Sequence, residues 1–166
     1  MRKNALFLAS CFIGAASYLV AAPKTAEARY KRVPGTECTV DLQSYNIARM
    51  NSDGFNNVAN SNTQIYTTCA VPSDDVFPHH QAVSMSVHVY DATSSGQVSV
   101  YTCVIFNGAF GGLCGTGVST TNAFTGVSVL SPPMSVLQTH EFDFPHVWGM
   151  VPGYGSSIKG FFMRDW

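Results

Sequence analysis

The sequence has few charged residues. Lys and Arg number 9 and Asp and Glu 10 in 166 residues, so charged residues make up 11% of the chain. Residues 29–166 contain six basic and nine acidic residues, which gives them a formal charge of −3. No basic cluster is large enough to hold a phosphate backbone, so we expect no binding of nucleic acid. The polarity comes from Ser, Thr, Asn and Gly, as is common in secreted β-proteins.

Several catalytic signatures are also absent. The chain has no Gly-x-Ser-x-Gly, no phosphate-binding loop that ends in Gly-Lys-Ser/Thr, and no calcium loop. Ser156 and Lys159 are spaced as Ser-x-x-Lys, but the two further motifs of penicillin-recognising enzymes do not occur. We therefore predict no catalytic residues and no cofactor, and we expect a protein that is not an enzyme.

The N-terminus has the three parts of a secretory signal peptide. A short positive start is followed by the uncharged residues 5–22, and a small-residue Ala-x-Ala exit ends at Ala28. We predict that residues 1–28 are removed and that residues 29–166 form one domain in the periplasm, at the cell surface or outside the cell. After cleavage we expect no stable insertion in a membrane.

Two alternatives for the N-terminus remain open. Residues 5–22 approach the length that spans a bilayer, so an uncleaved anchor is the first alternative. The second is a lipid on Cys11, because Leu-Ala-Ser-Cys at 8–11 is similar to a lipobox. Its apolar region would be shorter than the roughly 7–15 residues of a signal peptide, which disfavours lipidation.

Four cysteines follow the predicted cleavage site: Cys38, Cys69, Cys103 and Cys114. An even number in an exported chain predicts disulfides, and four cysteines allow three pairings. We favour Cys103–Cys114, which closes a Gly-rich loop, with Cys38–Cys69 tying the N-terminal segment to a strand. No Cys-x-x-Cys pair is present, which disfavours a cysteine zinc site.

Alternating apolar residues predict β-structure. Residues 83–90 are apolar at every second position, the period of a half-buried strand. A turn at 91–96 and a second strand at 97–106 complete a predicted β-hairpin. His88 lies on the polar side of its strand, so we expect it to face solvent.

We predict an all-β fold, an antiparallel two-sheet sandwich of about seven strands. The remaining strand candidates, separated by turn-rich segments, are 39–45, 64–71, 124–130, 147–151 and 157–163. No segment shows a sustained helical period, and the best helix candidate is 47–59. We expect the last strand to be paired, because an unpaired terminus frays.

The chain resembles a class of small exported bacterial proteins that consist of a single β-sandwich. The segments that carry the resemblance are TCAVP at 68–72, VHVYD at 87–91, YTC at 101–103, and VP at 151–152 followed by SSIKGF at 156–161. In this class a cysteine often precedes the late proline, where this chain has Gly149. The resemblance implies an exported location and a sandwich fold, and it carries no catalytic residues.

Two loops suggest a metal site. Residues 74–80 (DDVFPHH) and 140–146 (HEFDFPH) both place carboxylates before Phe-Pro-His, and imidazole and carboxylate are good ligands of zinc or copper. If the following strands run the same way, the loops meet at one end of the sandwich. The candidate ligands are His79, His80, His140 and His146, although exposed loops often contain such residues.

Aromatic residues suggest a binding surface. Trp148, Tyr154 and Trp166 are candidates for stacking on a surface glycan or on a protein partner, although such residues also fill sandwich cores. Our leading hypothesis is an exported, disulfide-containing sandwich with a non-enzymatic binding or cell-surface role. The alternatives are a metal-binding protein or metalloenzyme that uses the histidine loops, and a structural subunit that accepts a strand from a neighbour.

Overall fold

The structure is a computed structural model that describes residues 28–52, 54–60, 63–108 and 111–165. The predicted leader, its cleavage site up to residue 27, Cys11 and Trp166 lie outside the described residues. The described residues therefore belong almost entirely to the predicted exported domain, residues 29–166.

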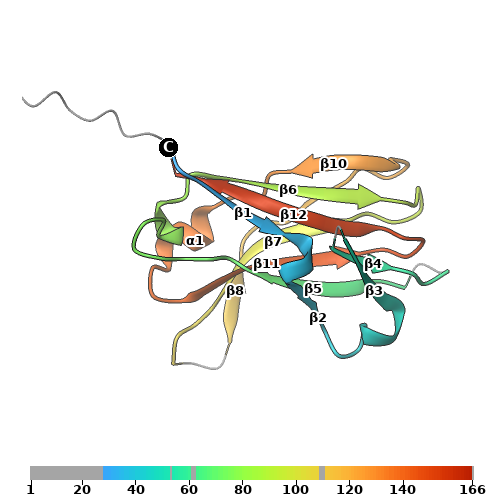
Figure 1. The fold of residues 1–166 in the computed structure, drawn as a ribbon, viewed down its shortest axis with the longest axis horizontal. Helices are drawn as coiled ribbons and strands as arrows, with labels where there is room; N and C mark the ends of the chain where they lie inside the picture. The colour runs from blue at the N-terminus through green and yellow to red at the C-terminus, as the bar shows by residue number, and fades with distance from the viewer. Residues whose placement is uncertain (1–27, 53, 61–62, 109–110, 166) are drawn as a thin grey trace, which may run out of the picture.

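Two antiparallel sheets of six strands each form the domain (Figure 1). The first sheet has the order β10-β6-β12-β4-β3, and β1 also pairs with β12. Its strands are β1 (Tyr30–Pro34), β3 (Ala48–Asn51), β4 (Gly54–Asn57), β6 (Ser84–Asp91), β10 (Gly126–Leu130) and β12 (Ser157–Arg164).

The second sheet has the order β2-β5-β11-β7-β8, with β9 also paired to β7. Its strands are β2 (Cys38–Val40), β5 (Ile65–Ala70), β7 (Ser99–Ile105), β8 (Gly112–Cys114), β9 (Val118–Ser119) and β11 (Phe144–Val151). The helical segments are short: η1 (Gly35–Glu37), η2 (Tyr45–Ile47), η3 (His79–Gln81) and α1 (Ser135–Thr139).

The all-β two-sheet sandwich is therefore confirmed, with twelve strands in place of about seven. The count differs because several strands have only two to four residues, which is too short for an alternating pattern to show. The last strand is paired, as predicted, with β1, β4 and β6.

The core lies between the sheets and is made of alternate strand residues. Val87 and Val89 of β6 and Val147 and Val151 of β11 are fully buried. Burying each such side chain stabilises the fold by about 1.5–3 kcal/mol. Gly149 faces this core, because a Cβ there would lie 2.3 Å from Ile158 Cδ1. Glycine at 149 therefore makes room for a neighbour from the opposite sheet.

The predicted hairpin of residues 83–106 is wrong. Strand β6 belongs to the first sheet and β7 to the second, so the connection crosses the sandwich. Buried Asp91 fixes the start of this crossing, because its carboxylate accepts hydrogen bonds from the Thr93 N–H (3.2 Å) and from the Thr120 hydroxyl. Alternation identified both strands correctly but carries no information on which sheet each one joins.

The best helix candidate of the sequence, 47–59, does not form a long helix, because β3 and β4 form a hairpin there. Gly54 has a φ of 130° and approaches the neighbouring strand so closely that a Cβ would lie 2.4 Å from the Ile158 carbonyl oxygen. The buried Asn57 amide donates hydrogen bonds to the carbonyl oxygens of Thr63 (2.6 Å) and Val151 (2.9 Å). These tertiary contacts decide the conformation of a segment whose helix propensity is weak.

Both disulfides have the predicted pairing. Cys38–Cys69 joins β2 to β5, and Cys103–Cys114 joins β7 to β8. Each links two residues that lie directly opposite each other on adjacent strands. Two disulfides indicate an oxidising environment, such as the periplasm or the outside of the cell. Among the described residues, no helix has the length and apolarity to cross a membrane.

A partly buried ion pair joins the two ends of the domain. The Arg29 guanidinium contacts the fully buried carboxylate of Asp165, whose other oxygen accepts a hydrogen bond from the Arg29 backbone N–H at 2.7 Å. Burial acts to raise the pKa of Asp165, but the Arg29 backbone and side chain together hold this pKa below its usual range. The pair therefore stabilises the folded state only while Asp165 is ionised.

We expect Asp165→Asn to lower the unfolding midpoint at neutral pH. A carboxyl with a lowered folded-state pKa contributes stability above its unfolded pKa, and that contribution is lost as the pH falls through the folded value. The difference in unfolding midpoint between wild type and variant should therefore disappear in acid. Urea unfolding at a series of pH values, from neutral to strongly acidic, measures this difference. Asp75→Asn, at an exposed loop position, is the control. A gap that persists in strong acid would contradict this account.

Candidate functional site

The two histidine loops meet at one end of the sandwich, as the sequence suggested. His79 is buried, and its Nε2 lies 2.9 Å from the His140 carbonyl oxygen. A carbonyl only accepts, so Nε2 carries the proton. The other ring nitrogen, Nδ1, lies 2.9 Å from the Ser73 hydroxyl. Both nitrogens of His79 are therefore engaged within the protein.

The neighbouring side chains are paired in the same way. His140 Nδ1 lies 2.8 Å from Asp143 Oδ2, and His80 Nε2 lies 3.7 Å from Glu141 Oε1. The backbone N–H of Asn107, followed by His140, holds the pKa of Asp143 below its usual range. This network ties the loops together.

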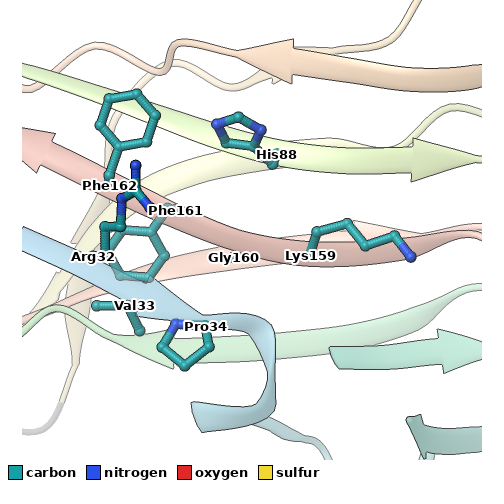
Figure 2. Close-up of a pocket in the computed structure, with 8 residues that line it drawn as sticks. All are labelled: Arg32, Val33, Pro34, His88, Lys159, Gly160, Phe161 and Phe162. Atoms are coloured by element: carbon teal, nitrogen blue, oxygen red, sulfur yellow. The ribbon is translucent and has the colours of Figure 1, made fainter. Parts of the chain in front are cut away.

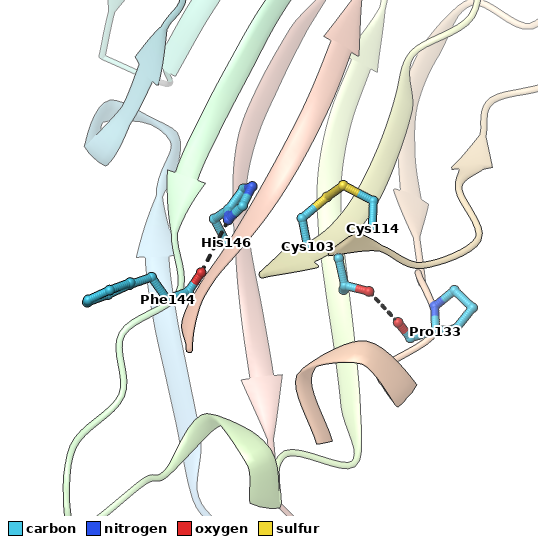
Figure 3. Close-up of a disulfide and its surroundings, with 6 residues drawn as sticks. Cys103, Cys114, Pro133, Phe144 and His146 are labelled. Carbon is cyan, nitrogen blue, oxygen red and sulfur yellow. Dashed lines mark hydrogen bonds between the residues drawn. A yellow bond between two sulfur atoms is a disulfide. The ribbon is translucent and has the colours of Figure 1, made fainter. Parts of the chain in front are cut away.

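The four histidines do not converge on one site. His146 lies on β11 and faces outward beside the Cys103–Cys114 disulfide (Figure 3). Within the described part of the chain, no group of three or more His, Cys, Asp or Glu side chains is placed to hold a metal ion. The ring nitrogens of His79 and His140 form hydrogen bonds within the protein instead, and these bonds hold the two loops together.

Two of the three aromatic candidates, Trp148 and Tyr154, lie in the described part of the chain. Trp148 is half-buried on the outer face of the second sheet. Tyr154 is in the turn between β11 and β12, 52% exposed, and its N–H donates to the Ala59 carbonyl. Trp166 lies outside the described residues. Of the two described candidates, Trp148 belongs to a larger aromatic cluster.

An aromatic row crosses the outer face of the second sheet. The Trp148 ring stacks on the Tyr66 ring, with centroids 5.5 Å apart and planes 6° apart. On its other side it meets the Tyr101 ring at 5.3 Å and 52°. These residues come from the adjacent strands β5, β11 and β7, and Trp148 lies directly opposite Tyr101. Such pairs add about 0.5–1.5 kcal/mol beyond their buried area, so the row is a rigid feature.

Gly117 completes the row. A Cβ at this position would lie 2.2 Å from Cε1 of Tyr101, so the tyrosine ring packs on a backbone that has no side chain. Gly117 lies between β8 and β9, the two short strands that pair with β7 at this edge. The Tyr101 ring therefore packs against the short segment that separates β8 from β9.

A hollow of about 330 Å³ lies beside the row. Its lining residues come from β7, β8 and β11, and they are Cys103, Val104, Ile105, Gly112, Leu113, Cys114, His146 and Trp148. Figure 3 shows the disulfide and His146 on this part of the sheet. The indole of Trp148, the exposed side chains of Ile105 and Leu113, and the disulfide make most of the lining apolar.

His146 supplies the ionisable group of this hollow. Partial burial lowers the pKa of His146, and a weak contact with the Phe144 carbonyl, 3.4 Å from Nδ1, opposes that shift only in part. At neutral pH the ring is therefore predominantly neutral, with Nδ1 donating to the Phe144 carbonyl and Nε2 left as a hydrogen-bond acceptor.

The second sheet carries no formal charge on its strands. None of the residues of β2, β5, β7, β8, β9 and β11 is Asp, Glu, Lys or Arg. The outer face instead presents aromatic rings with Thr39, Thr68 and Ser119 around them, and the Ser119 hydroxyl lies 2.7 Å from that of buried Ser99. We call this surface, centred on Trp148 and the adjoining hollow, the aromatic face.

Sequence patterns identified Trp148 but not the aromatic face. Tyr66 and Tyr101 occupy outward positions in strands that were predicted correctly, yet nothing in either strand shows that both flank β11. The absence of charge from these strands was the available signal.

Comparisons with known proteins give little further information. No family model and no curated protein matches the chain. Among solved structures, the chain is similar to a family two carbohydrate esterase from Cellvibrio japonicus, at 7% sequence identity and a TM-score of 0.44. The match covers 84% of this chain and 34% of that one, so the chain spans about a third of the esterase.

We expect Gly117→Ala to disturb the aromatic row. The new methyl group must displace the Tyr101 ring, and overpacking of this kind typically costs about 1–3 kcal/mol. Unfolding in urea should show the loss, and the near-ultraviolet circular dichroism of the stacked rings should weaken. Gly115→Ala, whose Cβ would have its nearest contacts at 3.3 Å, should change the near-ultraviolet signal much less. Equal signals in both variants would contradict the packing of Tyr101 on Gly117.

Proposed function

We propose that the protein is an exported binding module that holds a neutral saccharide on its aromatic face. The observation that carries the proposal is the Tyr66–Trp148–Tyr101 row beside an uncharged hollow. Sugar rings have an apolar side that packs on aromatic rings and hydroxyl groups that need hydrogen bonds. The aromatic face supplies both, through Trp148 and through His146 with the surrounding threonines and serines.

The shape of the face supports a binding role. Ligand sites are typically hollows of about 300–1,000 Å³, lined mainly by apolar and aromatic groups with a few polar ones. The hollow of about 330 Å³ is in this range. Leu113 and Ile105 remain 47% and 48% exposed at its rim, so apolar surface is available for a partner to cover.

The test is a calorimetric titration of the mature protein with cellohexaose, xylohexaose and chitohexaose. We expect at least one of them to bind and Trp148→Ala to weaken that binding tenfold or more, because buried aromatic anchors typically contribute about 2 kcal/mol or more. Leu113→Ser removes an exposed wall of the hollow without touching the core. It should weaken binding while leaving the unfolding midpoint unchanged.

Val127→Ser is the matched control, since Val127 is 69% exposed on the first sheet. It should bind as the wild type does. Failure of all three oligosaccharides to bind, or equal losses in Leu113→Ser and Val127→Ser, would reject the aromatic face as a saccharide site.

A second candidate function, acceptance of a strand from a neighbouring copy, is favoured by β10. This strand pairs only with β6, so its other edge is open among the described strands. Val127 and Val129 are exposed on it, and residues 92–140 contain no Asp, Glu, Lys or Arg. Proteins normally protect such an edge with charge or proline. An antiparallel pair centred on Ser128 would place Val127 beside Val129 of the other copy.

Light scattering over a range of concentrations tests this candidate. We expect the wild type to self-associate and Val129→Lys to remain monomeric, because a lysine on an edge strand opposes pairing. Val76→Lys, at an exposed loop position, should associate as the wild type does. A wild type that is monomeric at every concentration would exclude pairing through β10.

A further inference from the structure

The two sheets differ sharply in charge. The strands of the first sheet contain five of the six basic residues of residues 29–166, namely Lys31, Arg32, Arg49, Lys159 and Arg164. The one acidic residue on the described strands is Asp91, which is buried and hydrogen-bonded. The first sheet is therefore cationic although the domain as a whole has an excess of acidic residues.

A second hollow, of about 420 Å³, lies within this cationic sheet (Figure 2). It spans β1, β12 and β6, and its lining residues are Arg32, Val33, Pro34, His88, Lys159, Gly160, Phe161 and Phe162. Figure 2 shows Arg32, Lys159, His88 and Phe162 rising from these neighbouring strands. We call it the cationic hollow.

Glycine shapes the middle of the cationic hollow. Gly160 lies between Pro34 of β1 and His88 of β6 and has a φ of 138°. A Cβ at 160 would lie 2.5 Å from the Val33 carbonyl oxygen. Glycine at 160 therefore lets β12 and β1 approach each other closely. The longer side chains around Gly160 border the open space above it.

The side chains around that space combine charge with aromatic surface. The Arg32 side chain is exposed and has no hydrogen bond or ion pair within the described residues. Lys159 Nζ lies 5.7 Å from the centroid of the Tyr90 ring, and the His88 ring lies 5.5 Å from the Phe162 ring. Unlike the Arg32 side chain, the Lys31 side chain is paired with Asp74, outside this hollow.

We propose that the cationic hollow binds an anionic saccharide through its carboxylate groups. The Arg32 guanidinium offers a planar pair of donors that matches a carboxylate, and Lys159 offers a second positive charge on the neighbouring strand. Phe162 and Pro34 provide apolar surface for the carbon side of the ring. This site is distinct from the aromatic face, because it lies on the other sheet and selects for charge.

The geometry favours a small anion over an extended one. A hollow of about 420 Å³ is in the range of small-ligand sites of about 300–1,000 Å³. A membrane surface or a nucleic acid would need cationic side chains spread over a broad surface, whereas the cationic side chains that line this hollow are Arg32 and Lys159. A single charged sugar unit needs only the contacts within the hollow.

The test is a calorimetric titration of the mature protein with trigalacturonic acid at low salt. We expect binding that weakens as sodium chloride rises. Arg32→Gln and Lys159→Gln should each weaken it about tenfold, the change expected when one hydrogen bond to a charged group is lost. Galactotriose, which lacks the carboxylates, should not compete.

Two controls separate this site from general charge and from the aromatic face. Arg49→Gln removes one positive charge from β3 and should bind trigalacturonic acid as the wild type does. Leu113→Ser, which changes the aromatic face, should also bind it as the wild type does. The proposal is wrong if the acid does not bind, if Arg32→Gln and Lys159→Gln leave its affinity unchanged, or if Arg49→Gln weakens it equally. Binding to phosphatidylglycerol vesicles without binding to the trisaccharide would also overturn it.

Discussion

The register of β11 between β5 and β7 is the constraint on which the second sheet depends. It places Trp148 opposite Thr68 and Tyr101 on the outer face, and it places Gly149 on the inner face, where it makes room for Ile158. Because side chains alternate, a slip of one residue would move Trp148 into the core and a core residue to the surface. The same register therefore determines the packing of the core and the composition of the aromatic face.

The sandwich separates two kinds of chemistry. The strands of the second sheet carry no formal charge, and their outer face holds aromatic rings beside a neutral histidine. The first sheet gathers most of the basic residues around a hollow between β1, β12 and β6. The disulfides fix strand pairs at the edges of the second sheet, and the Arg29–Asp165 pair joins the two ends of the described domain. The scaffold thus presents two surfaces that differ in charge and in aromatic content.

Patterns along the chain predict what is local and miss what is tertiary. Alternation located β6, β5 and β12, and the cysteine spacing favoured the disulfides that the structure contains. The sequence pattern did not show that β6 and β7 lie in different sheets. It also did not show that 47–59 forms a hairpin held by Asn57. The aromatic face was missed for the same reason, because Tyr66, Trp148 and Tyr101 come together only through strand order. The histidine loops did meet, but their ring nitrogens serve structural hydrogen bonds.

The register of β11 is most directly tested by nuclear Overhauser spectroscopy of the mature protein. In a Trp166→Phe variant, the remaining indole is that of Trp148, since the chain has two tryptophans. The account predicts cross-peaks from this indole to the ring protons of both Tyr66 and Tyr101. Cross-peaks from the Trp148 indole to core methyl groups such as those of Val87 or Val89, without contacts to either tyrosine, would contradict it.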